Sequence, residues 1–242
     1  MAVSIDTVYQ RVLALANKEQ RGYITPQEFN LFANQAQMVI FEQYFYDINQ
    51  FSKQPGNDTE YSDMLDLLNK KLAPFQNTSS NLSYSAVSTT FALPSDSYRL
   101  GTVMYSPSSF SYPVEVTEIK ENELLHINAS PIARPIAKRP VYTRTGINSI
   151  KILPTTIEAD VTCTYVKAPT RKNGLDAKWG YAVINGQALY NANETTDFML
   201  HESEESSLVI NILELAGITL NKPGLVQIAQ NERNSKITQE KQ

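Results

Sequence analysis

The side chains best suited to metal or acid–base chemistry gather in one short run, His201-Glu202-Ser203-Glu204-Glu205. One imidazole and three carboxylates could supply nitrogen and oxygen ligands to a divalent metal. The same carboxylates also suit the first turn of a helix, where the helix dipole favours negative charge. We predict this second role, a solvated helix start, and therefore no metal site and no cofactor.

The other reactive side chains have no obvious partners in the sequence. Cys163 lies in an alternating apolar–polar run, which predicts a small core group rather than a nucleophile. His126 has no acid or base near it, and Asp63 and Asp66 fall on a helix surface. The sequence contains no phosphate-binding loop, dinucleotide-binding glycine pattern, nucleophile elbow or HExxH motif. We predict no catalytic residues and no enzyme activity. A cell-wall hydrolase remains an alternative, because a converging pair of acids cannot be recognised from sequence.

Charge is unevenly distributed along the chain. The stretch from Leu124 to Ile157 has basic but no acidic residues, and the stretch from Trp179 to Asn221 has acidic but no basic residues. This pattern either arises by chance or marks a head-to-tail contact between copies. A third reading is that the basic stretch faces nucleic acid and binds its phosphates without reading bases. For the contact between copies, the candidate residues are Arg134, Lys138, Arg139 and Arg144 on one copy and Glu202, Glu204 and Glu205 on the next.

Length and composition narrow the class of protein. The chain has 242 residues, 42% of them hydrophobic, with a net charge of -4, which suits one large or two small domains and argues against a globally cationic nucleic-acid binder. A single cysteine excludes an internal disulfide. No run approaches the roughly 18 apolar residues of a membrane span, and the start of the chain does not resemble a signal peptide. We predict no membrane partner.

The first 75 residues have the spacing of helices. A first helix has Ile5, Val8, Val12 and Leu15 on one face. Thr25-Pro26-Gln27-Glu28 is a capping box that predicts the start of a second, longer helix, running to about residue 48. The second half of that helix is apolar on all sides, which favours cover by a neighbouring chain. A third helix ends before Pro74.

Residues 76–178 change character and read as short strands rich in Ser, Thr, Val and Tyr. We predict a small antiparallel sandwich or barrel there. Helix returns at 179–229, where Ser203-Glu204-Glu205 opens one helix that Gly217 ends and Pro223 opens another. Residues 230–242 form a polar tail, which is either a solvated helix or a disordered segment that orders on meeting a partner. The predicted fold class is therefore α+β: a helical bundle built from both chain ends, with an inserted antiparallel β-sandwich or barrel.

Several short segments spread over most of the chain form a recognisable set. They are YITPQEFN from Tyr23, FALPSDSYRL from Phe91, SPIARP from Ser130, KRPVY from Lys138, WGY from Trp179 and DFMLHESEE from Asp197. Together they resemble a virion protein of short-tailed bacterial viruses, especially the crAss-like group. None of these segments is a catalytic signature.

The resemblance implies a head-to-tail connector, adaptor or tail-ring protein in the neck of the virion. Such proteins have a helical body with a β insertion and form twelve-subunit rings. By this resemblance the partners are copies of the chain, the portal protein, other neck and tail rings, and double-stranded DNA that passes through without sequence-specific binding. The protein would be made in the host cytoplasm and end in the virion. An alternative from the residues is a tail module that binds a host receptor or carbohydrate, since the predicted strands are rich in tyrosine (Tyr84, Tyr98, Tyr105, Tyr112).

Overall fold

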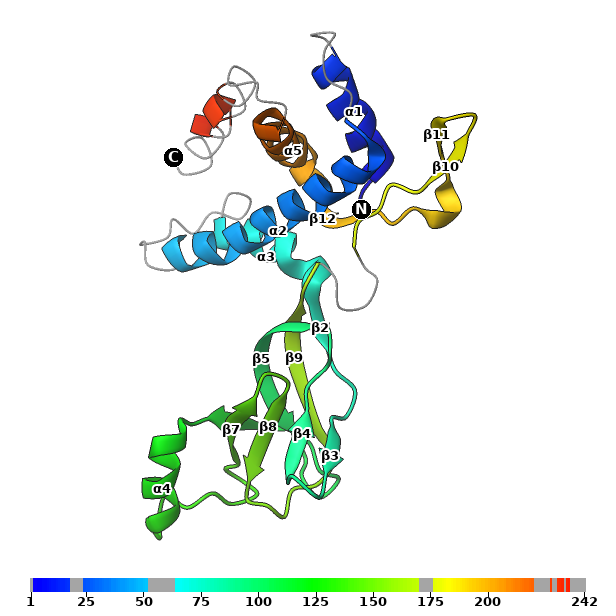
Figure 1. Cartoon of the computed structure of the whole chain (residues 1–242). Coiled ribbons are helices and arrows are strands. Elements are labelled where there is room, and N and C mark those ends of the chain that lie inside the picture. Colours follow the sequence, from blue (N-terminus) through cyan, green and yellow to red (C-terminus); the bar gives the residue numbers. More distant parts are fainter. Residues whose placement is uncertain are drawn as a thin grey trace. The chain divides into compact units, whose positions relative to one another are not determined.

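A computed structural model of the chain describes residues 2–17, 24–51, 64–169 and 176–219, with 227, 230–232, 234 and 235. These residues have a mixed α+β fold with helices at both ends, which confirms the predicted class (Figure 1). The chain divides into two compact units: Met1–Pro74 with Pro169–Gln242, here the helical unit, and Phe75–Ala168, here the β unit. We predicted the insertion at residues 76–178; the part of that range from Pro169 onward belongs to the helical unit.

The two N-terminal helices begin close to the predicted positions, and each buries most of the face that its apolar spacing predicts. Helix α1 spans Ile5–Asn17 and α2 spans Pro26–Phe51. The predicted capping box forms, because Glu28 accepts the Thr25 N–H at 3.0 Å while the Glu28 N–H donates to Thr25 Oγ1 at 3.3 Å. The Thr25 N–H and the Thr25 hydroxyl, at 3.0 and 2.8 Å, both donate to the carboxylate of Glu28 and hold its pKa below its usual value. On α1, Ala16 rather than Leu15 completes the buried face, because the helical period of 3.6 residues places Ala16 there.

The rest of the helical unit comes from both ends of the chain. Helix α3 (Met64–Leu72) packs on α2, and α5 (Glu205–Thr219) packs on both α1 and α2. The short strand β1 (Ala2–Val3) pairs with β12 (Phe198–His201). The remaining short helices are η1 (Ala73–Phe75), η2 (Ala192–Glu194) and η3 (Glu202–Glu204).

The C-terminal prediction needs two corrections. Strands rather than helix occupy most of the region from 181 to 201, whereas the helix predicted to open at Ser203-Glu204-Glu205 does begin there, at Glu205. Gly217 does not end α5, because it is buried within a helix whose packing on α1 and α2 outweighs the low helix propensity of glycine. Most of the predicted last helix from Pro223 and of the tail 230–242 lies outside the described residues.

The β unit contains one curled sheet. Within the described residues this sheet has eight strands, in the order β2-β9-β5-β6-β7-β8-β4-β3. Neighbouring strands are antiparallel except β6 and β7, which are parallel. This pair is the exception to the predicted antiparallel arrangement. The strands span Gln76–Thr78 (β2), Ser83–Ser85 (β3), Thr90–Ala92 (β4), Ser97–Tyr105 (β5), Val114–Glu118 (β6), Val141–Gly146 (β7), Ser149–Leu153 (β8) and Val161–Lys167 (β9).

The two edge strands of this sheet, β2 and β3, follow one another directly along the chain. After β2, the chain keeps bonding to β9 through Ser79 N–H to the Cys163 carbonyl and Leu82 N–H to the Val161 carbonyl, both at 2.8 Å. It then enters β3 at the opposite edge. The sheet therefore curls around a single buried cluster. That cluster includes Phe91, Val103, Val116, Ile150, Val161 and Cys163. The predicted sandwich or barrel is therefore confirmed only in part: the described strands form a single curled sheet.

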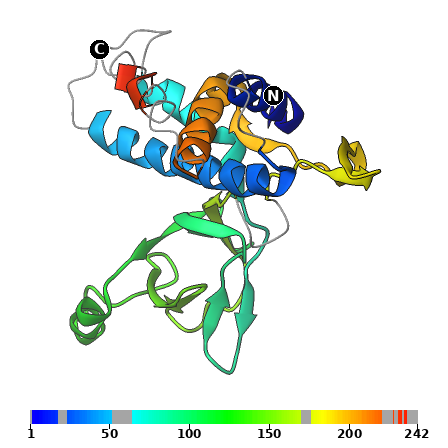
Figure 2. The ribbon, with the colours of Figure 1, turned by 45° about the horizontal axis from the view of Figure 1, so that its top comes forward.

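A helix that the sequence reading missed connects the parallel pair. Helix α4 spans Glu121–Ala129 between β6 and β7, and it lies apart from the strands in both views (Figures 1 and 2). Parallel neighbours need such a crossover, whereas antiparallel neighbours can be joined by a tight turn. Its apolar residues alternate with polar ones around the helix, so it shows no apolar stripe by which periodicity could have revealed it. No helix among the described residues has the length and apolar character to cross a membrane.

Candidate functional site

A β-hairpin extends from the helical unit. Strands β10 (Tyr181–Ile184) and β11 (Gln187–Tyr190) pair antiparallel and turn at Asn185-Gly186. Both turn residues have positive φ, 52° and 78°, as a type I′ turn requires. Figure 1 shows the hairpin reaching away from α1, α2 and α5.

The base of the hairpin is held by Trp179. Its ring centroid lies 4.4 Å from that of Tyr9 on α1, and it also contacts the rings of Tyr181 and Tyr190 at 6.0 and 5.7 Å. Its indole N–H donates to the carboxylate of Asp6 at 2.9 Å. The aromatic contacts and the hydrogen bond together fix the direction in which the hairpin leaves the helices.

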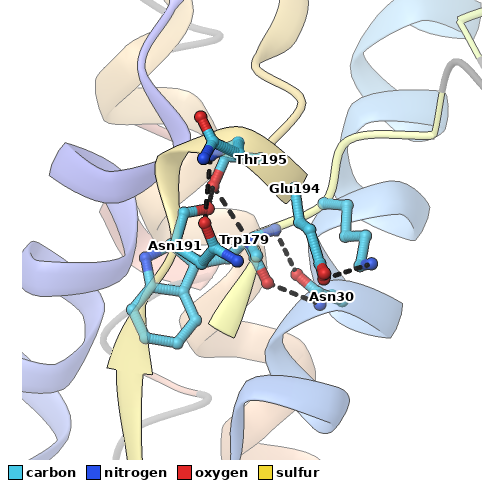
Figure 3. Close-up of polar contacts among 8 residues, drawn as sticks. Asn30, Trp179, Asn191, Glu194 and Thr195 are labelled. Carbon is cyan, nitrogen blue, oxygen red and sulfur yellow. Dashed lines mark hydrogen bonds and ion pairs between the residues drawn. The ribbon is translucent and has the colours of Figure 1, made fainter. Parts of the chain in front are cut away.

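Hydrogen bonds between side chains and the backbone around Trp179 complete this anchor (Figure 3). Its N–H donates to Asn30 Oδ1 at 2.8 Å, and its carbonyl accepts from Asn30 Nδ2 at 3.3 Å. Thr195 Oγ1 accepts the Gly180 N–H at 3.1 Å and donates to the Asn191 carbonyl at 2.8 Å. A Cβ on Gly180 would lie 2.6 Å from the Glu194 carbonyl carbon, so only glycine allows this close approach.

Beyond its base the hairpin is apolar on both faces and exposed. Val183, Ile184 and Leu189 are 65%, 54% and 49% exposed, and Val183 and Ile184 point to opposite faces because side chains alternate along a strand. No charged residue occurs between Lys178 and Glu194. Strands that are apolar on both faces are normally covered on both, and an isolated two-stranded hairpin is marginally stable. A rigidly held, uncharged apolar hairpin is therefore suited to insertion into another protein surface.

The sequence reading missed the hairpin, although two signals mark it. Asn185-Gly186 stands between two apolar runs, which is a strong short-range hairpin signal. The charge-free run around it, from Trp179 to Asn193, is the second signal.

The predicted basic contact residues all lie in the β unit. Arg134, Lys138 and Arg139 are exposed in the segment between α4 and β7, and none of them has an ion pair with a described residue. Arg139 donates instead to the Ile132 carbonyl at 3.2 Å. Arg144, on β7, is half-exposed and pairs with Glu118 at 3.0 Å.

The predicted acidic contact residues behave differently from one another. Glu202 is exposed. Glu205 pairs with Arg11 of α1 at 2.8 Å. Glu204 is only 4% exposed and pairs with Lys71 of α3 at 2.6 Å. The prediction that Glu204 meets a neighbouring copy is therefore revised, because its carboxylate is enclosed and neutralised within its own unit.

The remaining candidates for chemistry lie in structural positions. Burial raises the pKa of the Cys163 thiol, which belongs to the core of the β unit. Burial and the charge of Glu118 raise the pKa of Tyr142 to about 12. Among the described residues, no three His, Cys, Asp or Glu side chains converge as a metal site would require.

The tyrosines that suggested a carbohydrate-binding module do not contact one another in the ring contacts of the described residues. Tyr84 packs on Phe91 and Tyr105 packs on Phe110, with ring centroids 5.1 and 6.1 Å apart. Tyr98 stands at the far end of β5 from Tyr105.

Comparison with known proteins gives no assignment. No protein-family model matches the chain, and no curated protein matches it significantly.

Proposed function

We propose that this protein is a structural component of a short-tailed, crAss-like bacteriophage virion. It forms a ring in the portal–tail neck, as a head-to-tail adaptor or tail ring protein, around the channel through which the genome passes. Its role is assembly rather than catalysis, and it needs no cofactor.

The observation that carries this proposal is the hairpin. Its base is fixed by Trp179, Asn30 and Asp6, while its strands leave Val183, Ile184 and Leu189 uncovered. An element fixed so firmly at one end and left apolar at the other is pre-organised for binding, because little conformational entropy is lost when it docks. A protein whose function is to join copies and neighbours needs such surfaces.

The segments that resemble the phage proteins also lie at the positions that build this architecture. Thr25 and Glu28 cap α2. Asp96 pairs with Lys167 at 3.4 Å and so links the start of β5 to the end of β9. Trp179 anchors the hairpin. Agreement between the resembling segments and these structural positions supports a shared architecture.

The partners follow from the same resemblance. They are further copies of the chain, twelve in a ring, together with the portal protein and the other neck and tail rings. Double-stranded DNA passes through the ring without sequence-specific binding. The assembled protein lies in the virion.

Ring formation tests the proposal directly. Native mass spectrometry and averaged electron images of the purified full-length chain should show closed rings, and particles of the phage should carry the protein at the neck. A chain that stays monomeric and is missing from particles would overturn the proposal. A receptor- or glycan-binding monomer at the tail tip would favour the alternative module.

A variant pair isolates the hairpin in the same assay. V183S, I184S and L189S together should reduce ring yield while leaving the circular dichroism and the Trp179 fluorescence unchanged. The matched control is V87S, I147S and Y112S, which changes three exposed side chains of the β unit and should assemble like the wild type.

A further inference from the structure

Helix α4 lacks the cover that a short helix needs. It has nine residues, none of them buried, and Leu125 is 74% exposed. Its N-cap residue, Lys120, makes no side-chain capping bond. Helices of this length are unstable in water unless a neighbouring surface packs against them. Within the described residues of the β unit, Leu124 and Ile127 are only partly covered and no residue of α4 is buried.

The segment after α4 combines exposed apolar and basic side chains. Ile132 and Ile136 are 85% and 45% exposed, and the exposed cations Arg134, Lys138 and Arg139, which have no ion pair with a described residue, lie around them. The segment has a defined shape, since an isolated bridge joins Ile136 to Arg139 and the Arg134 N–H donates to the Ser130 carbonyl at 3.1 Å. We call Glu121–Ala129 and residues 130–140 the α4 arm.

The composition of the α4 arm fits a protein better than a nucleic acid. Phosphate contacts need cations and gain little from apolar side chains such as Leu125 and Ile132. Glu121 and Glu123 in the first turn of α4 would also repel phosphates. A surface that buries apolar groups among complementary charges is typical of a protein–protein contact.

The helical unit has the complementary charge. From Trp179 to Asn221 the sequence has six acidic residues and no basic one. Asp197 and Glu202 are exposed at the two ends of β12, and Glu205, which is partly exposed and pairs with Arg11 of α1, opens α5. We call Asp197, Glu202 and Glu205 the acidic face.

We propose that the α4 arm of one copy docks on the acidic face of a second copy, where Leu125 and Ile132 become buried and Arg134, Lys138 and Arg139 meet the carboxylates. This inference rests on the proposed function. The contact is heterologous, because the two surfaces differ, and heterologous contacts repeated with a closing rotation form rings.

A pair of charge reversals tests this contact on the full-length chain. The first variant carries R134E, K138E and R139E. The second carries E202K and E205K, and keeps Asp197 because that carboxylate accepts the Ile5 N–H at the start of α1. Each variant alone opposes like charges at the contact, so self-association should weaken by about tenfold or more. An equimolar mixture restores opposite charges at every contact and should assemble into alternating rings, a rescue that misfolded variants could not give.

A charge-preserving variant, R134K with K138R and R139K, is the matched control and should assemble like the wild type. If the first variant alone forms wild-type rings, this inference is wrong while the proposed function stands. Loss of DNA retention by that variant, with normal rings, would assign the α4 arm to nucleic acid and also overturn the inference. A wild-type chain that never associates would overturn the proposed function and this contact with it.

Discussion

Glu204 has a different environment in the structure from the one that its sequence neighbours suggest. It stands in an acidic run that suggests a solvated surface, yet its carboxylate, at the end of η3 just before α5, is buried against Lys71 of α3. Lys71 also lies 5.9 Å from the centre of the Tyr44 ring on α2. The ion pair therefore joins α3 to η3, and the contact of Lys71 with the Tyr44 ring adds α2. Such a pair contributes little compared with apolar packing, but removing one partner leaves a buried charge without compensation.

Replacing Lys71 by Met tests this role. The change removes the cation and keeps most of the side-chain volume, so the buried carboxylate of Glu204 loses its ion pair with Lys71. We expect the free energy of unfolding to fall by about 3 kcal/mol, measured by urea denaturation. The matched control is Lys70→Met, which breaks an exposed pair with Asp66 on the same helix and should cost less than about 1 kcal/mol. Equal losses for the two variants would contradict the buried-pair account.

At the scale of elements, the position of the hairpin depends on how closely the backbone packs around Gly180 at its base. Gly180 lies where the two strands leave the helical unit, and the backbone of Asn191 and Glu194 passes directly over its Cα. Gly186, at the tip, has nothing within 4 Å of an added Cβ. The two glycines thus have different functions: Gly180 allows a close approach, and Gly186 allows a left-handed turn.

Gly180→Ala should therefore disturb the hairpin base. The added methyl group must displace backbone, at a cost of about 1–3 kcal/mol. Trp179 is the single tryptophan of the chain, so its fluorescence should report the shift, and the ring formation that we propose should weaken with it. Gly186→Asn is the control, because asparagine tolerates positive φ and the site is open; it should leave the emission unchanged. An unaltered Trp179 spectrum in Gly180→Ala would show that the base can relax.

At the scale of the whole molecule, the two units have separate cores. The core of the β unit is the cluster inside the curled sheet. The helical unit needs both chain ends, because α1 and α2 from the start of the chain pack on α5 near its end. Leu208 and Ile212 of α5 are fully buried in that packing.

A chain that ends after Glu202 should separate the stabilities of the two units. Without α5, helices α1 and α2 lose the surface that covers them, so their amides should exchange at least about a hundredfold faster. The amides of β5 and β9 should keep their protection. Hydrogen exchange followed by mass spectrometry measures both. Val161→Asp in the core of the β unit is the reciprocal control and should expose β5 and β9 while leaving α1 and α2 protected. Joint loss of protection in either variant would show one cooperative unit.

The sequence by itself determined the features that depend on near neighbours along the chain. Thr25, Pro26 and Glu28 predict where α2 begins, and alternation across residues 160–167 predicts β9, because capping and side-chain alternation are local properties. Asn185-Gly186 and the uncharged run around it would have predicted the hairpin on the same grounds. The uneven distribution of charge is also visible in the sequence. The basic stretch contains the three exposed cations of the α4 arm.

Only the tertiary structure decided which distant segments meet. The parallel pairing of β6 with β7, the passage of one segment from one edge of the sheet to the other and the burial of Glu204 against Lys71 all join residues far apart in the chain. No local propensity encodes such pairings, because they are selected by the packing of the whole unit. The same reason separates Glu204 from Glu202: two acidic residues in one short run differ because the fold encloses one carboxylate and leaves the other exposed.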